Sequence, residues 1–353
     1  MTDLIVVGAG LTGATIARMA AEQDFKVLVL ERRSEIGGNV ADTVHESGIR
    51  YNLHGPHYFR TNSPMIWGFV NRFAVFKRYE AVLMTNVVNA YYPYPPHMNW
   101  TVERPLVGGE ATNFEAACLQ KMGPLFYDLF IKHYTKKQWG VDPTELDAGL
   151  ASRVELRTNG ELRLKDCKYQ GIPTGGYTEL VYSMLTHTKI DVETSTTCYL
   201  TETPMVYTGC IDELLGFRYG RLRYRTQKRE HIFHPNVGFL QPAVQINYPT
   251  PDVPYIRRIE WKHLPHNYPT TDGTLITTEF PQWATSPDEC EYPFPSYEDR
   301  QLYEKYRDDA DSLPNFIVCG RLGFYRYLDM DMAIGSAMNV FRDKVLPMLK
   351  KAS

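Results

Sequence analysis

The chain has no two cysteines close enough in sequence to form a CxxC pair. Its six cysteines are scattered along 353 residues, at Cys118, Cys167, Cys198, Cys210, Cys290 and Cys319. This spacing excludes a disulfide framework and a zinc-binding cluster, and it indicates reduced thiols. No stretch reaches the roughly 18 apolar residues that a transmembrane helix needs, and no basic leader precedes the first apolar run. We therefore expect a cytoplasmic protein with no membrane segment and no metal site.

An excess of positive charge is also missing, because the net charge is −3. Proteins that bind nucleic acid usually carry a basic face, so no nucleic-acid partner is expected. The hydrophobic fraction of 43% and the charged fraction of 22% exclude a disordered, collagen-like or coiled-coil chain. Aromatic residues are abundant at 13%, with 24 tyrosines. Tyrosine rings carry hydroxyl groups and suit the lining of a polar pocket.

A dinucleotide-binding signature occupies residues 4–31. A short β-branched run is followed by a G-x-G-x-x-G motif, an alanine-rich helix and a second apolar strand that ends at Glu31. In this βαβ context Gly8 permits a tight turn, Gly10 lets the backbone approach a pyrophosphate, and Gly13 lets helix and strand pack closely. The helix N-terminus offers N–H groups to phosphates, and Glu31 is placed to hydrogen-bond a ribose.

The bound dinucleotide is predicted to be FAD. A second glycine pair follows Glu31, as in FAD-binding proteins of the glutathione-reductase type, and no second G-x-G-x-x-G motif is present for NAD(P). The residues expected around the cofactor in this part of the chain are Gly8, Gly10, Leu11, Thr12, Gly13, Glu31, Arg32, Gly38 and Asn39.

Six later segments lie in a fixed order along the rest of the chain. They are GPHYFRT (55–61), YTKKQWG (134–140), YQGIPTGGYT (169–178), YTGCID (207–212), VPYIR (253–257) and GRLGFYRYLDM (320–330). Together with the nucleotide-binding motif, they resemble UDP-galactopyranose mutase of the bacterial type. The resemblance runs from residue 1 to about residue 345.

The resemblance implies an α/β fold with three parts: a Rossmann-like FAD-binding domain, an inserted helical bundle and a six-stranded antiparallel β-sheet domain. We expect the FAD-binding domain over 1–80 and 311–353. The mainly helical insertion is expected over 81–185, with a mobile lid near 153–168, and the sheet domain over 186–310. A homodimer is expected as well.

The activity that the resemblance implies is a redox-neutral isomerisation. In this family reduced FAD is the working form, and its N5 attacks the anomeric carbon of UDP-galactopyranose and expels UDP. Ring opening and reclosure then give UDP-galactofuranose. A cofactor that supplies the nucleophile removes the need for a Ser/His/Asp set or a carboxylate pair, and we find neither. The expected partners are a UDP-linked nucleotide sugar and a reductant such as NAD(P)H.

Arg157 and Arg257 match the family's two diphosphate-binding arginines. A guanidinium fork bonds phosphate oxygens at two points, and it stabilises charge that develops on a leaving diphosphate. Tyr169 matches the tyrosine expected to stack on uracil, and His57 matches a histidine close to the flavin. The other substrate-binding candidates are aromatic, namely Phe130, Tyr134, Trp139, Tyr292 and Tyr327.

The C-terminal segment is expected to return to the flavin. The positions that match this return are Gly320, Arg321, Tyr327, Asp329 and Met330. A helix that begins after residue 329 would again present its N-terminus to the cofactor.

The sequence departs from the family pattern beside the substrate cleft. Arg60 stands where the family usually has a second histidine, and His133 stands where it has a glycine. A threonine is usual at Ile256, and an acidic residue is usual at Phe324. The Asn-Tyr-Phe element of the lid is replaced by 161–165. These departures put the natural sugar and the nucleotide in doubt, while they leave the flavin site intact.

Three alternatives therefore stay open. The first is a related mutase, or a flavin-dependent rearrangement, that acts on another nucleotide sugar or nucleotide. The second is an FAD oxidoreductase of the amine-oxidase type, which the two retained arginines, Arg157 and Arg257, disfavour. The third is a non-catalytic flavin-binding scaffold, which has no need of Arg257 or Tyr327.

Overall fold

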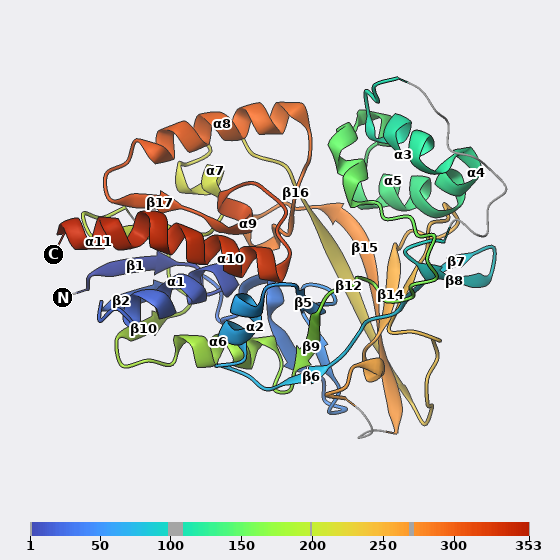
Figure 1. Cartoon of the computed structure of the whole chain (residues 1–353), viewed down its shortest axis with the longest axis horizontal. Coiled ribbons are helices and arrows are strands. Elements are labelled where there is room, and N and C mark those ends of the chain that lie inside the picture. Colours follow the sequence, from blue (N-terminus) through green and yellow to red (C-terminus); the bar gives the residue numbers. More distant parts are fainter. Residues whose placement is uncertain (1, 98–108, 198–199, 268–271, 353) are drawn as a thin grey trace.

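The computed structural model describes residues 2–97, 109–197, 200–267 and 272–352, so Cys198 lies outside the described residues. Figure 1 shows an elongated molecule. A parallel sheet with its helices forms one end, and a long twisted sheet capped by short helices forms the other.

The parallel sheet has five strands in the order β10-β2-β1-β11-β17. Its strands are β1 (Leu4–Val7), β2 (Val27–Leu30), β10 (Ile190–Glu193), β11 (Met205–Tyr207) and β17 (Phe316–Val318). Every neighbouring pair is parallel. The nearly continuous apolar runs of β1, β2, β11 and β17 suit strands that are covered on both faces, whereas β10 at the edge carries two acidic residues. This arrangement confirms the Rossmann-like part of the predicted fold.

Helices cover this sheet and bury its apolar side chains. α1 (Leu11–Ala21) follows β1 directly, and its small side chains let it pack closely against α10 (Met330–Val340) and α6 (Tyr177–Leu185). The chain continues from α10 through a π-helical turn, Phe341–Val345, into α11 (Leu346–Ala352). The largest core cluster of the protein lies between these helices and the sheet.

The second sheet has seven strands in the order β16-β12-β15-β14-β13-β7-β8. They are β7 (Leu83–Val87), β8 (Ala90–Tyr94), β12 (Tyr224–Pro235), β13 (Gln245–Asn247), β14 (Arg257–Glu260), β15 (Gly273–Trp283) and β16 (Tyr292–Pro293). All pairs are antiparallel except β13 with β7. The expectation of six strands that are all antiparallel was therefore wrong in detail. The sheet has seven strands, and β7 pairs in parallel with β13, where it supplies hydrogen-bond partners for the backbone of β13.

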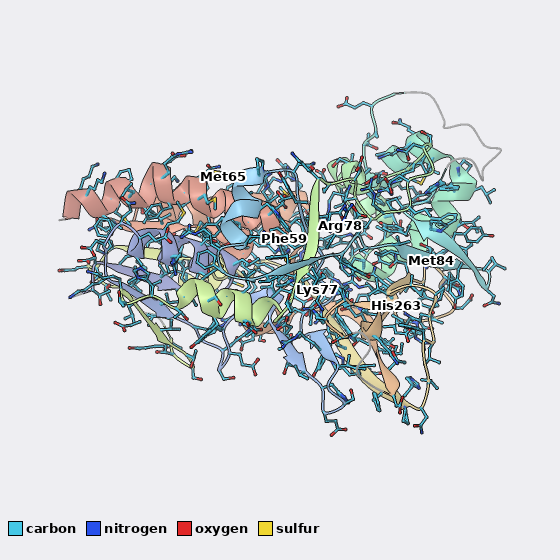
Figure 2. The ribbon with its side chains drawn as sticks, turned by 60° about the horizontal axis from the view of Figure 1, so that its bottom comes forward. Phe59, Met65, Lys77, Arg78, Met84 and His263 are labelled. Carbon is cyan, nitrogen blue, oxygen red and sulfur yellow. The ribbon has the colours of Figure 1, made fainter. Side chains whose placement is uncertain are left out.

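Two small sheets and several helices connect the large sheets. β5 (Phe59–Thr61), β9 (Tyr169–Pro173) and β6 (Phe76–Arg78) form one small sheet, and β3 (Asp42–Val44) pairs with β4 (Arg50–Asn52) in the other. Phe59 packs against Trp67 and Phe76, with ring centroids 6.2 and 5.4 Å away, while Met65 on α2 (Pro64–Val70) is exposed (Figure 2).

The helical part beside the long sheet runs from residue 114 to residue 153. It contains α3 (Phe114–Met122), α4 (Pro124–Tyr127), a π-helical turn over Asp128–Lys132, α5 (His133–Trp139) and 3-10 turns over Pro143–Glu145 and Ala148–Arg153. An aromatic core joins these helices. Three further helices, α7 (Ile211–Leu214), α8 (Tyr297–Asp311) and α9 (Gly320–Gly323), lie toward the parallel sheet.

Sheet membership differs from the expected ranges in two places. β10 and β11 fall within 186–310, yet they belong to the parallel sheet, and β7 and β8 fall within 81–185, yet they belong to the long sheet. A strand of three to five apolar residues does not encode its partner. Pairing depends on which open sheet edge the folded chain brings near it.

Candidate active site

A nucleotide cleft of about 450 Å³ lies at the carboxyl ends of β1, β2 and β11. Several glycines in its walls have neighbouring atoms so close that they leave no room for a side chain. A Cβ on Gly8, whose φ is +104°, would fall 2.2 Å from Thr208 Oγ1, and a Cβ on Gly38 would fall 3.0 Å from the Cα of Gly10. Side chains here would fill the cradle, so the cleft fits a flavin dinucleotide held against backbone N–H groups.

Most of the predicted cofactor residues line this cleft. They are Gly8, Gly10, Leu11, Thr12, Glu31, Arg32, Gly38, Asn39, His57, Arg321 and Met330. Gly13 does not line it: a Cβ there would fall 1.9 Å from the carbonyl oxygen of Gly8, so this glycine serves the contact between helix and strand. Gly320 lies against Thr12, behind the wall of the cleft.

Glu31 closes the end of β2 and is buried. Its carboxylate accepts hydrogen bonds from the N–H of Ala9 at 2.8 Å and of Arg33 at 3.0 Å. Arg32 is held by Glu213 at 2.8 Å and by Asp288 at 2.7 Å. Glu31, which was predicted to hold a ribose, therefore holds the turn that follows β1 in place.

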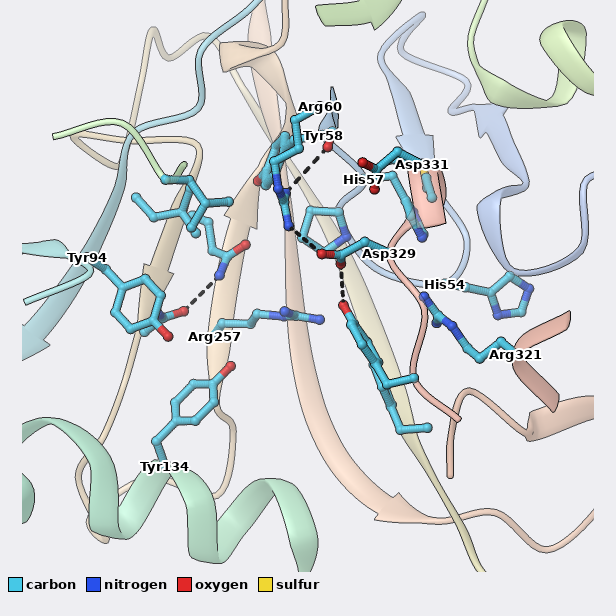
Figure 3. A pocket seen from close by; sticks show the side chains of 18 residues that line it. His54, His57, Tyr58, Arg60, Tyr94, Tyr134, Arg257, Arg321, Asp329 and Asp331 are labelled. Carbon is cyan, nitrogen blue, oxygen red and sulfur yellow. Dashed lines mark hydrogen bonds and ion pairs between the residues drawn. The ribbon is translucent and has the colours of Figure 1, made fainter. Parts of the chain in front are cut away.

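A central cavity of about 220 Å³ adjoins the nucleotide cleft, and the two share His57, Arg321 and Met330. Figure 3 shows Arg257 reaching into the centre of this cavity from β14, with Tyr134 of α5 on one side and Asp329 on the other. Residues that are far apart in sequence therefore meet around a single cation.

Arg257 belongs to a buried network of charges. Its guanidinium is paired with Glu279, and the other oxygen of Glu279 accepts a bond from Arg229 at 2.9 Å. Arg229 also donates from Nη1 and Nη2 to the two carboxylate oxygens of Glu291, at 2.7 and 2.9 Å, and His54 Nδ1 lies 3.2 Å from that carboxylate. Burial opposes the charge on Arg257, but the carboxylate of Glu279 outweighs it and raises the pKa of Arg257 well above its usual range. The cavity therefore contains a permanent cation.

A third, aromatic cavity of about 260 Å³ continues from the central one. The two share Tyr94, Tyr134, Asn247, Arg257, Tyr292 and Tyr327. Its far end is apolar and includes Phe130 and Trp139, which are buried in the helical part. Five of the six predicted aromatic candidates therefore line a continuous space with Arg257, namely Phe130, Tyr134, Trp139, Tyr292 and Tyr327.

Tyr327 lies at the junction of these two cavities and is held on several sides. Its hydroxyl donates to Asp329 Oδ1 at 2.9 Å, and Arg60 pairs with the other oxygen of Asp329 at 3.3 Å. The guanidinium carbons of Arg153 and Arg321 lie 3.8 and 4.8 Å from the centre of the Tyr327 ring. Arg60, a departure from the family pattern, is thus part of the site.

His57 lies where the nucleotide cleft meets the central cavity. Burial, with the nearby cation of Arg321, lowers the pKa of His57 to about 3. The imidazole is therefore neutral at physiological pH, and its Nδ1 has no hydrogen-bond partner among the described residues. His57 therefore presents an uncharged ring at the boundary of the two spaces, while Nδ1 itself is buried.

Besides Gly13 and Gly320, two predicted substrate-site residues, Arg157 and Tyr169, do not reach the cavities. The guanidinium of Arg157 is buried within its own segment, where it binds Glu155 at 2.7 Å and the carbonyl oxygens of Glu161 and Leu164 at 2.8 and 2.9 Å. Tyr169 stacks on Trp67 with ring centroids 5.5 Å apart. Neither residue lines any of the three cavities.

Several residues of the candidate site were missed by sequence reasoning. Arg153 reaches the aromatic cavity in place of Arg157, although both lie in the same charged segment. Arg229, Glu279 and Glu291 pair across β12, β15 and the segment before β16. Arg229 is 50 positions from Glu279 and 62 positions from Glu291 in sequence, so no local pattern signals these pairs.

Two features are absent within the described ranges, a membrane-spanning helix and a cluster of metal ligands. No helix there is both long and apolar enough to cross a bilayer. No three side chains of His, Cys, Asp or Glu gather there in a way that could hold a metal ion.

The chain is similar to known mutases along most of its length. A family model described as UDP-galactopyranose mutase matches residues 129–327, and a model described as an NAD(P)-binding Rossmann-like domain matches 6–73. A Klebsiella pneumoniae protein named "Probable UDP-galactopyranose mutase" is 32% identical over 359 residues, which cover 95% of this chain and 93% of that protein. The dTDP-fucopyranose mutase of Escherichia coli is also 32% identical, over 96% of this chain and 97% of its own length.

The fold agrees as well. The crystal structure of a reduced UDP-galactopyranose mutase superimposes with a TM-score of 0.79, at 17% identity, over 99% of this chain and 96% of that one. The family model covers more than half of the chain, and the relatives align with nearly all of it. The chain therefore belongs to the UDP-galactopyranose mutase family.

Proposed function

We propose that this enzyme interconverts UDP-galactopyranose and UDP-galactofuranose without net oxidation, with reduced FAD as its cofactor. The observation that carries the proposal is the position of Arg257. This permanent cation lies in one continuous space, between the nucleotide cleft that a flavin fits and the aromatic cavity.

The family and the nucleotide cleft imply a flavin, and FAD is proposed because the cleft follows a dinucleotide-binding motif. When bound there, reduced flavin would supply the nucleophile for the anomeric carbon of the sugar. The residues of the chain that would hold it include Gly8, Gly10, Gly38 and Glu31. A reductant such as NAD(P)H would keep it reduced between turnovers.

Arg257 binds the diphosphate in this proposal. Its pairing with Glu279 fixes the plane of the guanidinium, while the side chain still faces the cavity. As the bond to the sugar breaks, negative charge grows on the departing diphosphate, and a cation that is already oriented stabilises that charge. Arg153, over the ring of Tyr327, adds a second positive charge at the same junction.

The aromatic cavity holds the base, and the junction holds the sugar. Phe130 and Trp139 form the apolar end, and Tyr134 faces Arg257 across the cavity. The hydroxyl of Tyr327 and the carboxylate of Asp329 form a hydrogen-bonded pair that is able to orient sugar hydroxyls. His57 offers its neutral ring between the sugar and the flavin.

The experiment is an anaerobic assay of the purified protein, reduced once with dithionite and supplied with UDP-galactopyranose. We expect UDP-galactofuranose to accumulate over many turnovers without consumption of further reductant. Consumption of one NAD(P)H per product would contradict the redox-neutral reaction and favour an oxidoreductase.

A second candidate is the same chemistry on another nucleotide sugar. The equal identity to a dTDP-fucopyranose mutase favours it, and so does Arg60, which lines the central cavity beside Asp329. Comparison of kcat/KM for UDP-galactopyranose and dTDP-fucopyranose with the same reduced enzyme decides between them.

A further inference from the structure

Lys137 of α5 has an unusual set of partners. Its ammonium nitrogen lies within hydrogen-bond distance of four backbone carbonyl oxygens, those of Tyr248 at 2.7 Å, Thr250 at 2.9 Å, Val253 at 3.1 Å and Tyr255 at 2.7 Å, which share its three N–H donors. Four carbonyl dipoles that converge on one point repel each other unless a cation lies between them. The lysine thus occupies the place that a monovalent metal ion takes in a carbonyl cage.

The four carbonyls belong to the turn that joins β13 to β14. Asn247 and Arg257 are paired at the base of this hairpin, and both line the central and aromatic cavities. The N–H of Tyr248 also donates to the carbonyl of Ile256 at 2.8 Å, which continues the hairpin pairing. Contacts with this turn therefore bear on the position of Arg257.

Lys137 itself comes from the opposite wall of the site. It follows Tyr134 by three residues on α5, and Tyr134 faces Arg257 across the cavity (Figure 3). Lys137 lines none of the three cavities. One ammonium group therefore joins the helix that carries Tyr134 to the hairpin that carries Arg257, without touching the space between them.

We propose that Lys137 is a positioning residue that sets the width of the substrate cavity by clamping the β13–β14 turn to α5. The role in binding rests on the proposed function, because it assumes that Arg257 takes the diphosphate. The clamp itself rests only on the four contacts of the ammonium group.

A second set of hydrogen bonds holds α5 to the long sheet without the side chain of Lys137. Arg225 of β12 donates to the carbonyl of Gln138 at 2.8 Å and to that of Lys137 at 3.1 Å, which holds the end of α5 to the sheet. These bonds use the backbone of Lys137 and survive a change of its side chain. The neighbouring Lys136 is exposed and pairs only with Asp142 among the described residues, so it provides a matched control.

The test compares Lys137→Met and Lys136→Met as flavin-loaded proteins, with UDP as the probe. We expect Lys137→Met to weaken UDP binding about ten- to one-hundredfold, because a displacement of about 1 Å at a binding group has effects of this size. Flavin content should stay unchanged, and Lys136→Met should bind UDP as the wild type does. Wild-type UDP affinity in Lys137→Met overturns the proposed role in binding.

Chemical rescue separates positioning from general stability. In Lys137→Ala the carbonyls lack their cation, so ammonium or ethylammonium chloride should restore UDP affinity. Tetramethylammonium chloride at equal concentration should not, because it has no N–H donor. Equal effects of all three salts contradict a carbonyl clamp and indicate a general salt effect.

Hydrogen exchange tests the clamp independently of the substrate. Amides of 248–257 should exchange faster in Lys137→Met than in Lys136→Met, while those of β12 keep their protection. Unchanged exchange overturns the clamp. If the wild type fails to bind UDP but this difference in exchange is present, the proposed function fails and the clamp stands.

Discussion

At the residue scale, the chemistry of the site depends on Arg257. We expect Arg257→Ala to lower kcat/KM by about ten- to a few-hundredfold, since losing a charge-assisted hydrogen bond costs about 1.5–3 kcal/mol. The main loss should be in kcat, because the cation assists departure of the diphosphate. Steady-state kinetics on the reduced enzyme measure the loss in kcat.

Arg257→Lys keeps the positive charge but lacks the two-point geometry of the guanidinium, so an intermediate rate is expected. Unchanged kinetics in both variants would exclude the diphosphate contact.

Arg153 and Arg157 are four positions apart, yet the structure gives them different surroundings. Arg153→Ala should raise KM about five- to thirtyfold, because a partly desolvated cation over an aromatic ring contributes on the order of 1–2 kcal/mol. Arg157→Ala should instead destabilise its segment, since it leaves the carbonyls of Glu161 and Leu164 without their donor. Steady-state kinetics and limited proteolysis of 153–168 distinguish these effects. If Arg157→Ala weakens UDP binding without a change in proteolysis, the segment rearranges around the substrate, as a lid would.

His57 should make stability depend on pH. Its pKa is lowered to about 3 in the folded protein, against 6.5 for an ordinary histidine. Between these values the unfolded chain binds more protons than the folded one. Stability should therefore fall as the pH drops from about 6.5 toward 3, by up to about 1.4 kcal/mol per pH unit from this group.

Urea midpoints at pH 7, 6 and 5 measure this effect. His57→Gln should show a flatter decline than the wild type, whereas His234→Gln, outside the three cavities, should follow the wild type. The same slope for His57→Gln and the wild type would show that His57 is not kept neutral by burial.

At the scale of elements, the β1–α1 unit tolerates little change at its closest contact. Gly13→Ala places a methyl group 1.9 Å from the carbonyl oxygen of Gly8, so the helix must shift away from the strand. We expect a loss of about 1–3 kcal/mol in unfolding free energy and a loss of bound flavin. Flavin absorbance and thermal unfolding measure the two effects.

A matched control is Gly68→Ala in the exposed face of α2. A Cβ at Gly68 has no heavy atom within 4 Å, so helix propensity alone should stabilise the variant by up to about 1 kcal/mol. If Gly13→Ala keeps its flavin and its stability, the contact between helix and strand is looser than the structure shows.

At the scale of the whole molecule, the site exists because three parts meet. The nucleotide cleft comes from the parallel sheet, Arg257 comes from the long sheet, and the aromatic wall comes from the helical part. The buried pairs of Arg229 and Arg257 with Glu279 and Glu291 join strands of the long sheet at this meeting point. Breaking one pair would leave a charge buried without its partner, which typically costs several kcal/mol.

The sequence by itself determined the nucleotide-binding unit and the order of the family segments. Gly8, Gly10 and Glu31 act over fewer than thirty residues, where strand, turn and helix follow one another directly. Arg257 and Tyr327 were also found this way, because each lies within a short segment typical of the family. Such features are local, so the spacing of residues along the chain is enough to identify them.

Only the tertiary structure decided how distant segments combine. In the folded chain β7 pairs with β13, and the side chain of Arg157 binds carbonyl oxygens of its own segment. Tyr169 stacks on Trp67, and Arg153 lies over the ring of Tyr327. The tertiary structure also brought four carbonyls of the β13–β14 turn around Lys137, more than 110 positions away. These outcomes depend on which surfaces meet after the chain has folded, and no pattern of neighbouring residues contains that information.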